Sequence, residues 1–256
     1  MRERIINELT AIEEQENARI LYACESGSRA WGFPSKDSDY DVRFIYIHPL
    51  DWYLSITDKR DVIERPINDL LDINGWDIRK ALKLFRKSNP PLLEWIQSPI
   101  VYWEKYSFVK KIRDLSPLTF SPRSCMYHYL SMAKGNFREY LQGEFVKVKK
   151  YFYVLRPVLA CLWIKQNNTM PPMEFELLVN AMLCDSPLKR EIEKLLIRKK
   201  SGDEFDLEPC IQVINDFLEQ EIININEYIQ SVEKSSVEDL KVLDGIFRDV
   251  LEEVWS

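Results

Sequence analysis

Residues 26–43 of the chain read SGSRAWGFPSKDSDYDVR. In this stretch the pair Gly27-Ser28 is followed by two aspartates, Asp39 and Asp41, with one residue between them. On a strand, an Asp-x-Asp pair places both carboxylates on one face, about 7 Å apart at Cα, which is close enough to share divalent cations. A Gly-Ser turn in front of a helix offers backbone N–H groups to a phosphate. The stretch therefore predicts a metal-dependent site for a nucleoside triphosphate.

The segments on both sides of this stretch are predicted to be strands. Residues 20–25 are an apolar run that leads into the Gly-Ser turn, and residues 41–47 alternate in polarity and are rich in β-branched and aromatic side chains. Two shorter candidate strands cover residues 61–64 and 68–73. Helices are expected at residues 1–18, from Asp77 and from Pro91.

The second half of the chain has a different pattern, because every periodic segment after about residue 107 is helical. The expected helices cover residues 121–142, 145–167, 173–183, 188–199, 209–232 and 236–255, and the last one opens with a Ser236-x-x-Asp239 capping box. Strands followed by helices indicate two packed modules. We therefore predict an α+β protein with a catalytic domain at residues 1–106, built on a short mixed sheet with helices, and an all-helical domain at residues 107–256.

The composition is that of a soluble globular protein, with 46% hydrophobic and 30% charged residues among 256. The N-terminus is charged, and Arg156-Pro157 interrupts the longest apolar stretch, so we expect neither a signal peptide nor a membrane span. The five cysteines are scattered, which is typical of reduced thiols in a cytoplasmic protein.

The net charge of −6 is unevenly distributed, since residues 203–256 hold 15 acidic and 3 basic residues. Such asymmetry can separate a nucleotide-facing or nucleic-acid-facing body from an acidic outer segment. It also arises from a solvated helical surface.

A two-metal site for phosphoryl transfer needs at least three carboxylates. The third candidate is Asp72, which lies between Leu71 and Ile73 in a predicted strand. Asp77 is the competitor, but it stands at the start of a predicted helix, where a carboxylate serves as a cap or interacts with the helix dipole. We therefore favour Asp72.

This order of features resembles the polymerase-beta-like nucleotidyltransferase superfamily: a strand, Gly-Ser, a helix, Ser-Asp-x-Asp on a second strand, and an apolar-flanked Asp on a third. The segments ESGSRAWG (25–32), GWDIRKAL (75–82) and SNP (88–90) look like the RNA-repair-pathway nucleotidyltransferases. The resemblance covers roughly residues 20–165.

The resemblance implies two Mg²⁺ ions, or Mn²⁺ in their place, on Asp39, Asp41 and Asp72. It implies a nucleoside triphosphate such as ATP as the donor, with Gly27 and Ser28 on its β- and γ-phosphates. Asp39 and Asp41 would hold the metal bound to the triphosphate. Asp41 and Asp72 would hold the second metal, on which an acceptor hydroxyl loses its proton and attacks the α-phosphorus while pyrophosphate leaves.

Two arginines and a second cluster complete the candidate nucleotide contacts. Arg29 or Arg43 can screen developing charge, although an arginine beside Asp-x-Asp can also be a simple ion-pair partner. Lys149 and Tyr153 are four residues apart on one helical face within a segment that mixes basic and aromatic residues. The alternative for most of that segment is two amphipathic helices with aromatic inner faces and solvated lysines.

Other chemistries find little support in the sequence. It has no Gly-x-x-x-x-Gly-Lys-Ser/Thr loop and no Gly-x-Gly-x-x-Gly, and its two histidines lack metal-ligand spacing. We predict transfer of a nucleoside monophosphate to an acceptor hydroxyl, and the family resemblance implies an RNA end in RNA repair as the acceptor. The alternatives are a protein or small-molecule hydroxyl, or a catalytically silent module that binds nucleotide or RNA.

Overall fold

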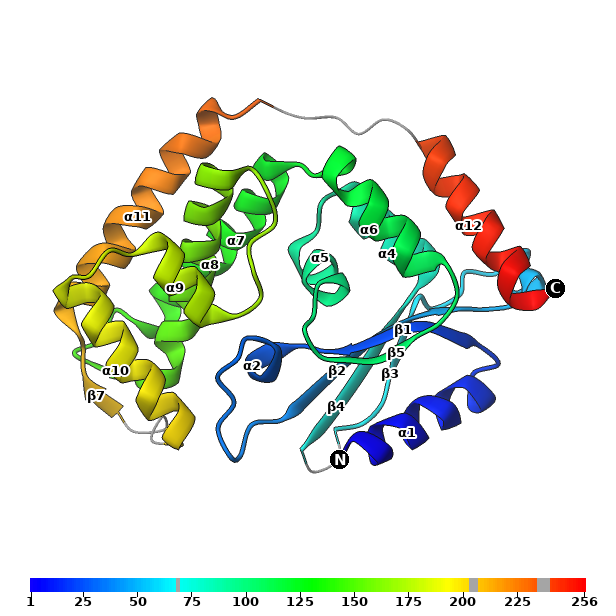
Figure 1. Ribbon diagram of the computed structural model, residues 1–256, viewed down its shortest axis with the longest axis horizontal. Helices are drawn as coiled ribbons and strands as arrows, with labels where there is room; N and C mark the ends of the chain where they lie inside the picture. The colour runs from blue at the N-terminus through cyan, green and yellow to red at the C-terminus, as the bar shows by residue number, and fades with distance from the viewer. Residues whose placement is uncertain (68–69, 203–206, 234–239) are drawn as a thin grey trace. The chain divides into compact units, whose positions relative to one another are not determined.

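The computed structural model describes residues 1–67, 70–202, 207–233 and 240–256. The chain divides into two units. The sheet unit comprises Met1–Ala30, Asp39–Thr119 and Ser236–Ser256, and the helical unit comprises Trp31–Ser38 and Phe120–Ser235. Figure 1 shows the elements of both units.

The sheet unit is built on five strands, as the mixed α+β prediction requires. They are β1 (Arg19–Glu25), β2 (Tyr40–Ile47), β3 (Val62–Glu64), β4 (Leu71–Asp77) and β5 (Val101–Glu104). Their order in the sheet is β3-β4-β2-β1-β5. The β2–β4 pair is parallel and the other pairs are antiparallel, so the sheet is mixed. The first two predicted strands are confirmed, and the predicted strand at residues 68–73 is found as β4, with residues 68 and 69 outside the described ones.

The two faces of the sheet differ in polarity because side chains alternate along each strand. On one face, Val42, Phe44 and Ile73 are buried in a cluster with Leu9 and Ile12 of helix α1 (Arg2–Gln15). The other face of β2 and β4 carries polar residues near the start of both strands. Figure 1 shows α1 on one side of the sheet and α4, α5 and α6 on the other.

The helices that follow β4 begin with capping residues. Helix α4 (Ile78–Arg86) begins where the Asp77 side chain accepts a hydrogen bond from the backbone N–H of Arg79. Helix α5 (Pro90–Ile96) begins where Asn89 caps it and proline occupies its first turn. Both helices were predicted. Two single-turn helices, α2 (Gly27–Ala30) and α3 (Leu50–Tyr53), complete this part of the unit.

Two helices that we predicted to belong with the helical domain group instead with the sheet. They are α6 (Phe108–Thr119) and α12 (Leu240–Trp255). The Nζ of Lys111 lies 2.6 Å from Asp249, and the Glu253 carboxylate accepts a hydrogen bond from the N–H of Ser107. The units thus differ from the predicted division after residue 106, because amphipathic periodicity marks a buried face without naming its partner. The predicted Ser236-x-x-Asp239 capping box lies outside the described residues.

The helical unit contains α7 (Pro122–Tyr140), α8 (Val148–Asn167), α9 (Phe175–Met182), α10 (Pro187–Ser201) and α11 (Gln212–Ser231). It also holds an antiparallel pair of three-residue strands, β6 (Phe145–Lys147) and β7 (Leu207–Pro209). Residues 145–147 and 209 were expected at the starts of helices, which is wrong, since so short a strand shows no periodicity of its own. Among the described helices, none is long and apolar enough to cross a membrane.

The segment between the Gly-Ser turn and Asp39 belongs to the helical unit. The ring of Phe33 packs 4.9 Å from Phe152 and 5.5 Å from Phe175, measured between centroids. The backbone N–H of Phe175 donates a hydrogen bond to the carbonyl of Trp31 at 2.9 Å. The chain therefore enters the helical unit after Ala30 and returns to the sheet unit at Asp39.

Candidate active site

Asp41 and Asp72 are direct partners in the parallel register of β2 and β4. Their side chains share one face of the sheet, and the guanidinium of Arg43 lies between them. Its Nη2 is 3.1 Å from Oδ1 of Asp41 and 2.8 Å from Oδ2 of Asp72. The two strand carboxylates thus form a half-buried anionic pair, and the single guanidinium of Arg43 offsets one of their two negative charges.

The Gly-Ser turn lies directly against Asp41. Gly27 has a φ of +57°, and a Cβ at this position would stand 2.0 Å from Oδ2 of Asp41. The N–H of Ser26 donates a hydrogen bond to the Asp41 carbonyl at 2.8 Å. Glycine is therefore required at position 27 for two reasons: the left-handed backbone conformation and the close approach of the Asp41 carboxylate.

Ser28 and Arg29 follow in α2, next to the start of β2. The guanidinium of Arg29 lies 3.6 Å from the centroid of the Tyr40 ring, and its Nε donates to the carbonyl of Asp39 at 3.0 Å. Arg29 therefore stabilises the backbone conformation of the residues just before Asp41.

Asp39 occupies a different position from the other two aspartates. It is exposed and precedes the first residue of β2. Among the described residues, no three His, Cys, Asp or Glu side chains are grouped so that they could hold a metal ion. The structure thus brings Gly27, Asp41 and Asp72 together, and the exposed Asp39 lies close enough for its charge to raise the pKa of Asp41.

Asp77 is far from this pair along β4 and serves the fold. It pairs with Tyr46, five positions beyond the Asp41–Asp72 pair, and it is fully buried. Its carboxylate caps α4 and accepts a hydrogen bond from the Tyr53 hydroxyl at 2.7 Å. Of the two candidates for a third carboxylate, Asp72 is the one that faces Asp41.

Glu25 is a residue of the site that the sequence analysis missed. It is fully buried at the end of β1 and accepts hydrogen bonds from the N–H of Asp41, at 2.7 Å, and from the Tyr102 hydroxyl. Burial raises the pKa of Glu25, although the bonds from Tyr102 and Asp41 oppose the shift. The available signal was a carboxylate that ends an apolar strand immediately before the Gly-Ser turn.

The electrostatics of the site favour an added cation. Burial raises the pKa of Asp41; the guanidinium of Arg43 lowers it, and the nearby Asp72 and Asp39 raise it again. Carboxylate oxygens are the ligands that Mg²⁺ and Mn²⁺ prefer. Asp41 and Asp72 therefore fit a shared divalent cation in chemistry and in register.

The remaining two predicted residues, Lys149 and Tyr153, lie on α8 of the helical unit. Beside them the Nζ of Lys150 lies 3.6 Å from the Tyr140 ring centroid and 5.2 Å from that of Tyr153. Desolvation lowers the pKa of Lys150, and the neighbouring charge of Lys149 adds to this effect. A basic and aromatic cluster is therefore formed by α8 together with Tyr140 of α7. Other aromatic and basic residues of that segment are core residues, namely Tyr129, Tyr151, Phe152 and Arg156.

A mixed sheet with a Gly-Ser turn beside paired strand aspartates is the arrangement expected of polymerase-beta-like nucleotidyltransferases. The chain matches the RNA repair pathway DNA polymerase beta family over residues 1–249, and it belongs to that family. It is 52% identical over 255 residues to the uncharacterized protein YcgL of Bacillus subtilis (strain 168), covering 100% of this chain and 98% of that protein.

A solved structure also matches, that of a nucleotidyltransferase-like protein from Exiguobacterium sibiricum 255-15. The match covers 97% of this chain and 80% of the other, with a TM-score of 0.34 and 13% identity. This similarity is too low to support a conclusion about the site.

Proposed function

We propose that the protein transfers a nucleoside monophosphate from a nucleoside triphosphate to a hydroxyl at an RNA end. The observation that carries the proposal is the pairing of Asp41 with Asp72 across β2 and β4, with Gly27 packed against Asp41. The description of the family as an RNA repair pathway family supports RNA as the acceptor.

The proposed cofactor is a pair of Mg²⁺ ions, with Mn²⁺ as a substitute, held by Asp39, Asp41 and Asp72. When bound, such ions neutralise the triphosphate and make the acceptor hydroxyl easier to deprotonate. Arg43 now supplies positive charge between Asp41 and Asp72. In this proposal the cations replace Arg43 at these carboxylates, and its guanidinium then contacts phosphate oxygens.

The residues of the chain have separate tasks in this proposal. The backbone N–H groups of Gly27 and Ser28 bind the leaving phosphates, where a bare turn admits close approach. Asp41 and Asp72 orient the acceptor oxygen toward the α-phosphorus. The acceptor hydroxyl loses its proton to water, its oxygen forms a bond to the α-phosphorus, the bond from the α-phosphorus to the oxygen that bridges to the β-phosphate breaks, and pyrophosphate leaves. The cluster of Lys149 and Tyr153 is proposed to contact nucleotide.

Incubating the protein with Mg²⁺, an RNA and each α-labelled nucleoside triphosphate tests the proposal. We expect label in RNA, and we expect Asp41→Asn and Asp72→Asn to reduce it by about 100-fold or more, since even residues behind metal ligands are worth 10–100-fold. The matched control is Asp37→Asn, an exposed aspartate of the same segment with no assigned role.

The distribution of label separates the acceptors. Label on a polypeptide or a small molecule, abolished by the same two variants, would keep the site and reject the RNA acceptor. Transfer that persists in Asp41→Asn and Asp72→Asn would reject the site itself. Absence of transfer to every acceptor, with nucleotide still bound, would favour a catalytically silent binding module.

A further inference from the structure

A cavity of about 570 Å³ lies between α4 and α12 in the sheet unit. Its lining residues are Arg79, Leu82, Lys83, Arg86, Lys87, Leu240, Leu243, Asp244 and Phe247. None of them is a proposed catalytic or nucleotide-binding residue. The cavity is therefore distinct from the site at Asp41 and Asp72.

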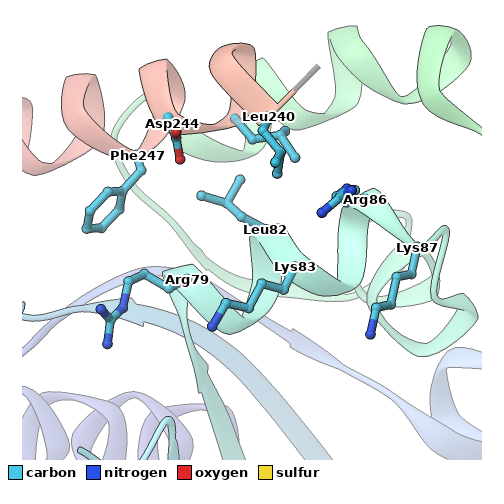
Figure 2. Close-up of a pocket in the computed structure, with 9 residues that line it drawn as sticks. Arg79, Leu82, Lys83, Arg86, Lys87, Leu240, Asp244 and Phe247 are labelled. Carbon is cyan, nitrogen blue, oxygen red and sulfur yellow. The ribbon is translucent and has the colours of Figure 1, made fainter. Parts of the chain in front are cut away.

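The cavity is apolar between the two helices. Leu82 of α4 and Leu243 of α12 are each 6% exposed and form its most buried part. Leu240, which is 48% exposed, and Phe247 continue the apolar surface along α12. Figure 2 shows the side chains of Leu82, Leu240 and Phe247 in the space between the helices. An apolar body can be buried there.

The α4 side of the cavity is strongly basic. Arg79 and Lys83 of α4 and Lys87, which follows its last residue, are spaced four residues apart. Figure 2 shows them in a row along the edge of the cavity, with their charged groups directed away from α12. Among the lining residues, Asp244 is the single carboxylate, against four cations. The cavity thus has an excess of positive charge.

These cations differ in how they are neutralised. Lys80, also on α4 but outside the lining, is paired with Asp61 at 3.1 Å. Arg79 contacts Asp77 at 3.8 Å and lies over the Tyr53 ring. Lys83, Arg86 and Lys87 form no ion pair with any residue in the part of the chain that the structure describes.

We propose that this cavity binds a small amphipathic anion, with an apolar body between α4 and α12 and a phosphate or carboxylate group against Lys83, Arg86 and Lys87. The volume lies within the range of about 300–1,000 Å³ that is usual for small-molecule sites. The four lining cations, from Arg79 to Lys87, span about two helical turns, or roughly 12 Å. This length suits a compact ligand better than a long peptide or an extended strand of nucleic acid. Phe247 is the only aromatic residue of the lining, and its ring already meets the Tyr53 ring edge-on, so successive bases have no stacking platform.

Isothermal titration calorimetry of the full chain, without nucleotide or metal ion, tests the proposal with octyl phosphate, inorganic phosphate and octan-1-ol. We expect octyl phosphate to bind about tenfold or more tightly than either of the others, because it alone meets both halves of the cavity. We expect the affinity for octyl phosphate to fall about tenfold in the double variant Lys83→Glu/Lys87→Glu. We expect a similar fall in the separate variant Leu240→Asn.

Lys241→Glu is the matched control, since Lys241 is an exposed neighbour on α12 that does not line the cavity. It should leave binding unchanged. If the double charge reversal lowers the melting temperature, Lys83→Gln with Lys87→Gln takes its place. Equal affinity for octyl phosphate and inorganic phosphate, or binding unaffected by the cavity variants, would overturn the proposal. The proposal would also be overturned if octyl phosphate did not bind and a ten-residue oligouridylate or an acidic amphipathic peptide bound in a way that depends on Lys83 and Lys87.

Discussion

A Cβ atom on Gly27 would stand 2.0 Å from Oδ2 of Asp41. The Gly-Ser turn and the strand aspartate are therefore in direct contact, and a side chain at residue 27 would displace the Asp41 carboxylate. The φ of +57° at Gly27 adds a second constraint, because this left-handed conformation is unfavourable for residues with a Cβ.

Gly27→Ala should consequently lower the rate of nucleotide transfer strongly and destabilise the fold only moderately. We expect the backbone conformation to cost about 1–2 kcal/mol of unfolding free energy, and the displaced Asp41 carboxylate to lower the transfer rate by about 100-fold. Gly245→Ala in α12 is the control, since nothing lies within 4 Å of its added Cβ. Unchanged transfer in Gly27→Ala would show that the close contact is not needed for activity.

Arg43 should compete with divalent cations for the two carboxylates. Arg43→Gln removes the positive charge between Asp41 and Asp72, so in chelator-treated protein we expect a loss of about 1–3 kcal/mol of unfolding free energy. Added Mg²⁺ or Mn²⁺ should then raise the melting temperature more in Arg43→Gln than in the wild type, because the cation no longer has to displace a guanidinium.

Adding Asp41→Asn and Asp72→Asn to Arg43→Gln supplies the control for this cation effect. The triple variant should lose the cation-dependent rise in melting temperature. A rise that persists without both carboxylates would place the cation elsewhere on the protein.

That Asp41 and Asp72 each lie on the polar face of an apolar strand could be predicted, because the period of two determines the face. Gly27 and Ser28 could be placed because a Gly-Ser turn at a strand end is a local feature. The role of Glu25 could not, since its partner Tyr102 is 77 residues away in the chain. The bridge from Arg43 to Asp72 likewise depends on strand order, which single strands do not reveal.

The grouping of distant segments was the least predictable feature. Helix α12 carries the expected apolar stripe, yet nothing local indicates that it packs with α4 and α6 rather than with the preceding helices. Phe33 reads as part of a polar loop, but its ring lies in the core of the helical unit. Both cases depend on contacts between residues far apart in sequence.

Glu25 should make stability depend on pH in a defined direction. Its pKa is raised in the folded protein, so the fold favours the neutral carboxyl, and stability present below the unfolded pKa of about 4.3 is lost as the pH rises through the folded value. Glu25→Gln cannot ionise. We therefore expect the melting temperature of Glu25→Gln, minus that of the wild type, to increase as the pH rises from about 4 to 7.

The hydroxyl of Tyr102 provides the companion variant. Tyr102→Phe removes a donor that stabilises ionised Glu25, so the loss of stability with rising pH should become larger than in the wild type. A constant difference in melting temperature between Glu25→Gln and the wild type across this range would contradict the raised pKa.

Substitutions at Asp72 and at Asp77 should have different effects, the first on nucleotide transfer and the second on stability. Asp77→Ala removes the cap of α4 and leaves the Tyr53 hydroxyl without its acceptor, so we expect the unfolding free energy to fall by about 2 kcal/mol or more. Well below its melting temperature, this variant should transfer nucleotide within about threefold of the wild type, because Asp77 lies five positions along β4 from Asp72. Asp72→Ala should show the opposite pattern, with transfer lost and the fold kept. Denaturant unfolding and labelled-nucleotide transfer, measured on both variants, decide the matter: a folded Asp77→Ala that is as inactive as Asp72→Ala would make Asp77 the third carboxylate of the site.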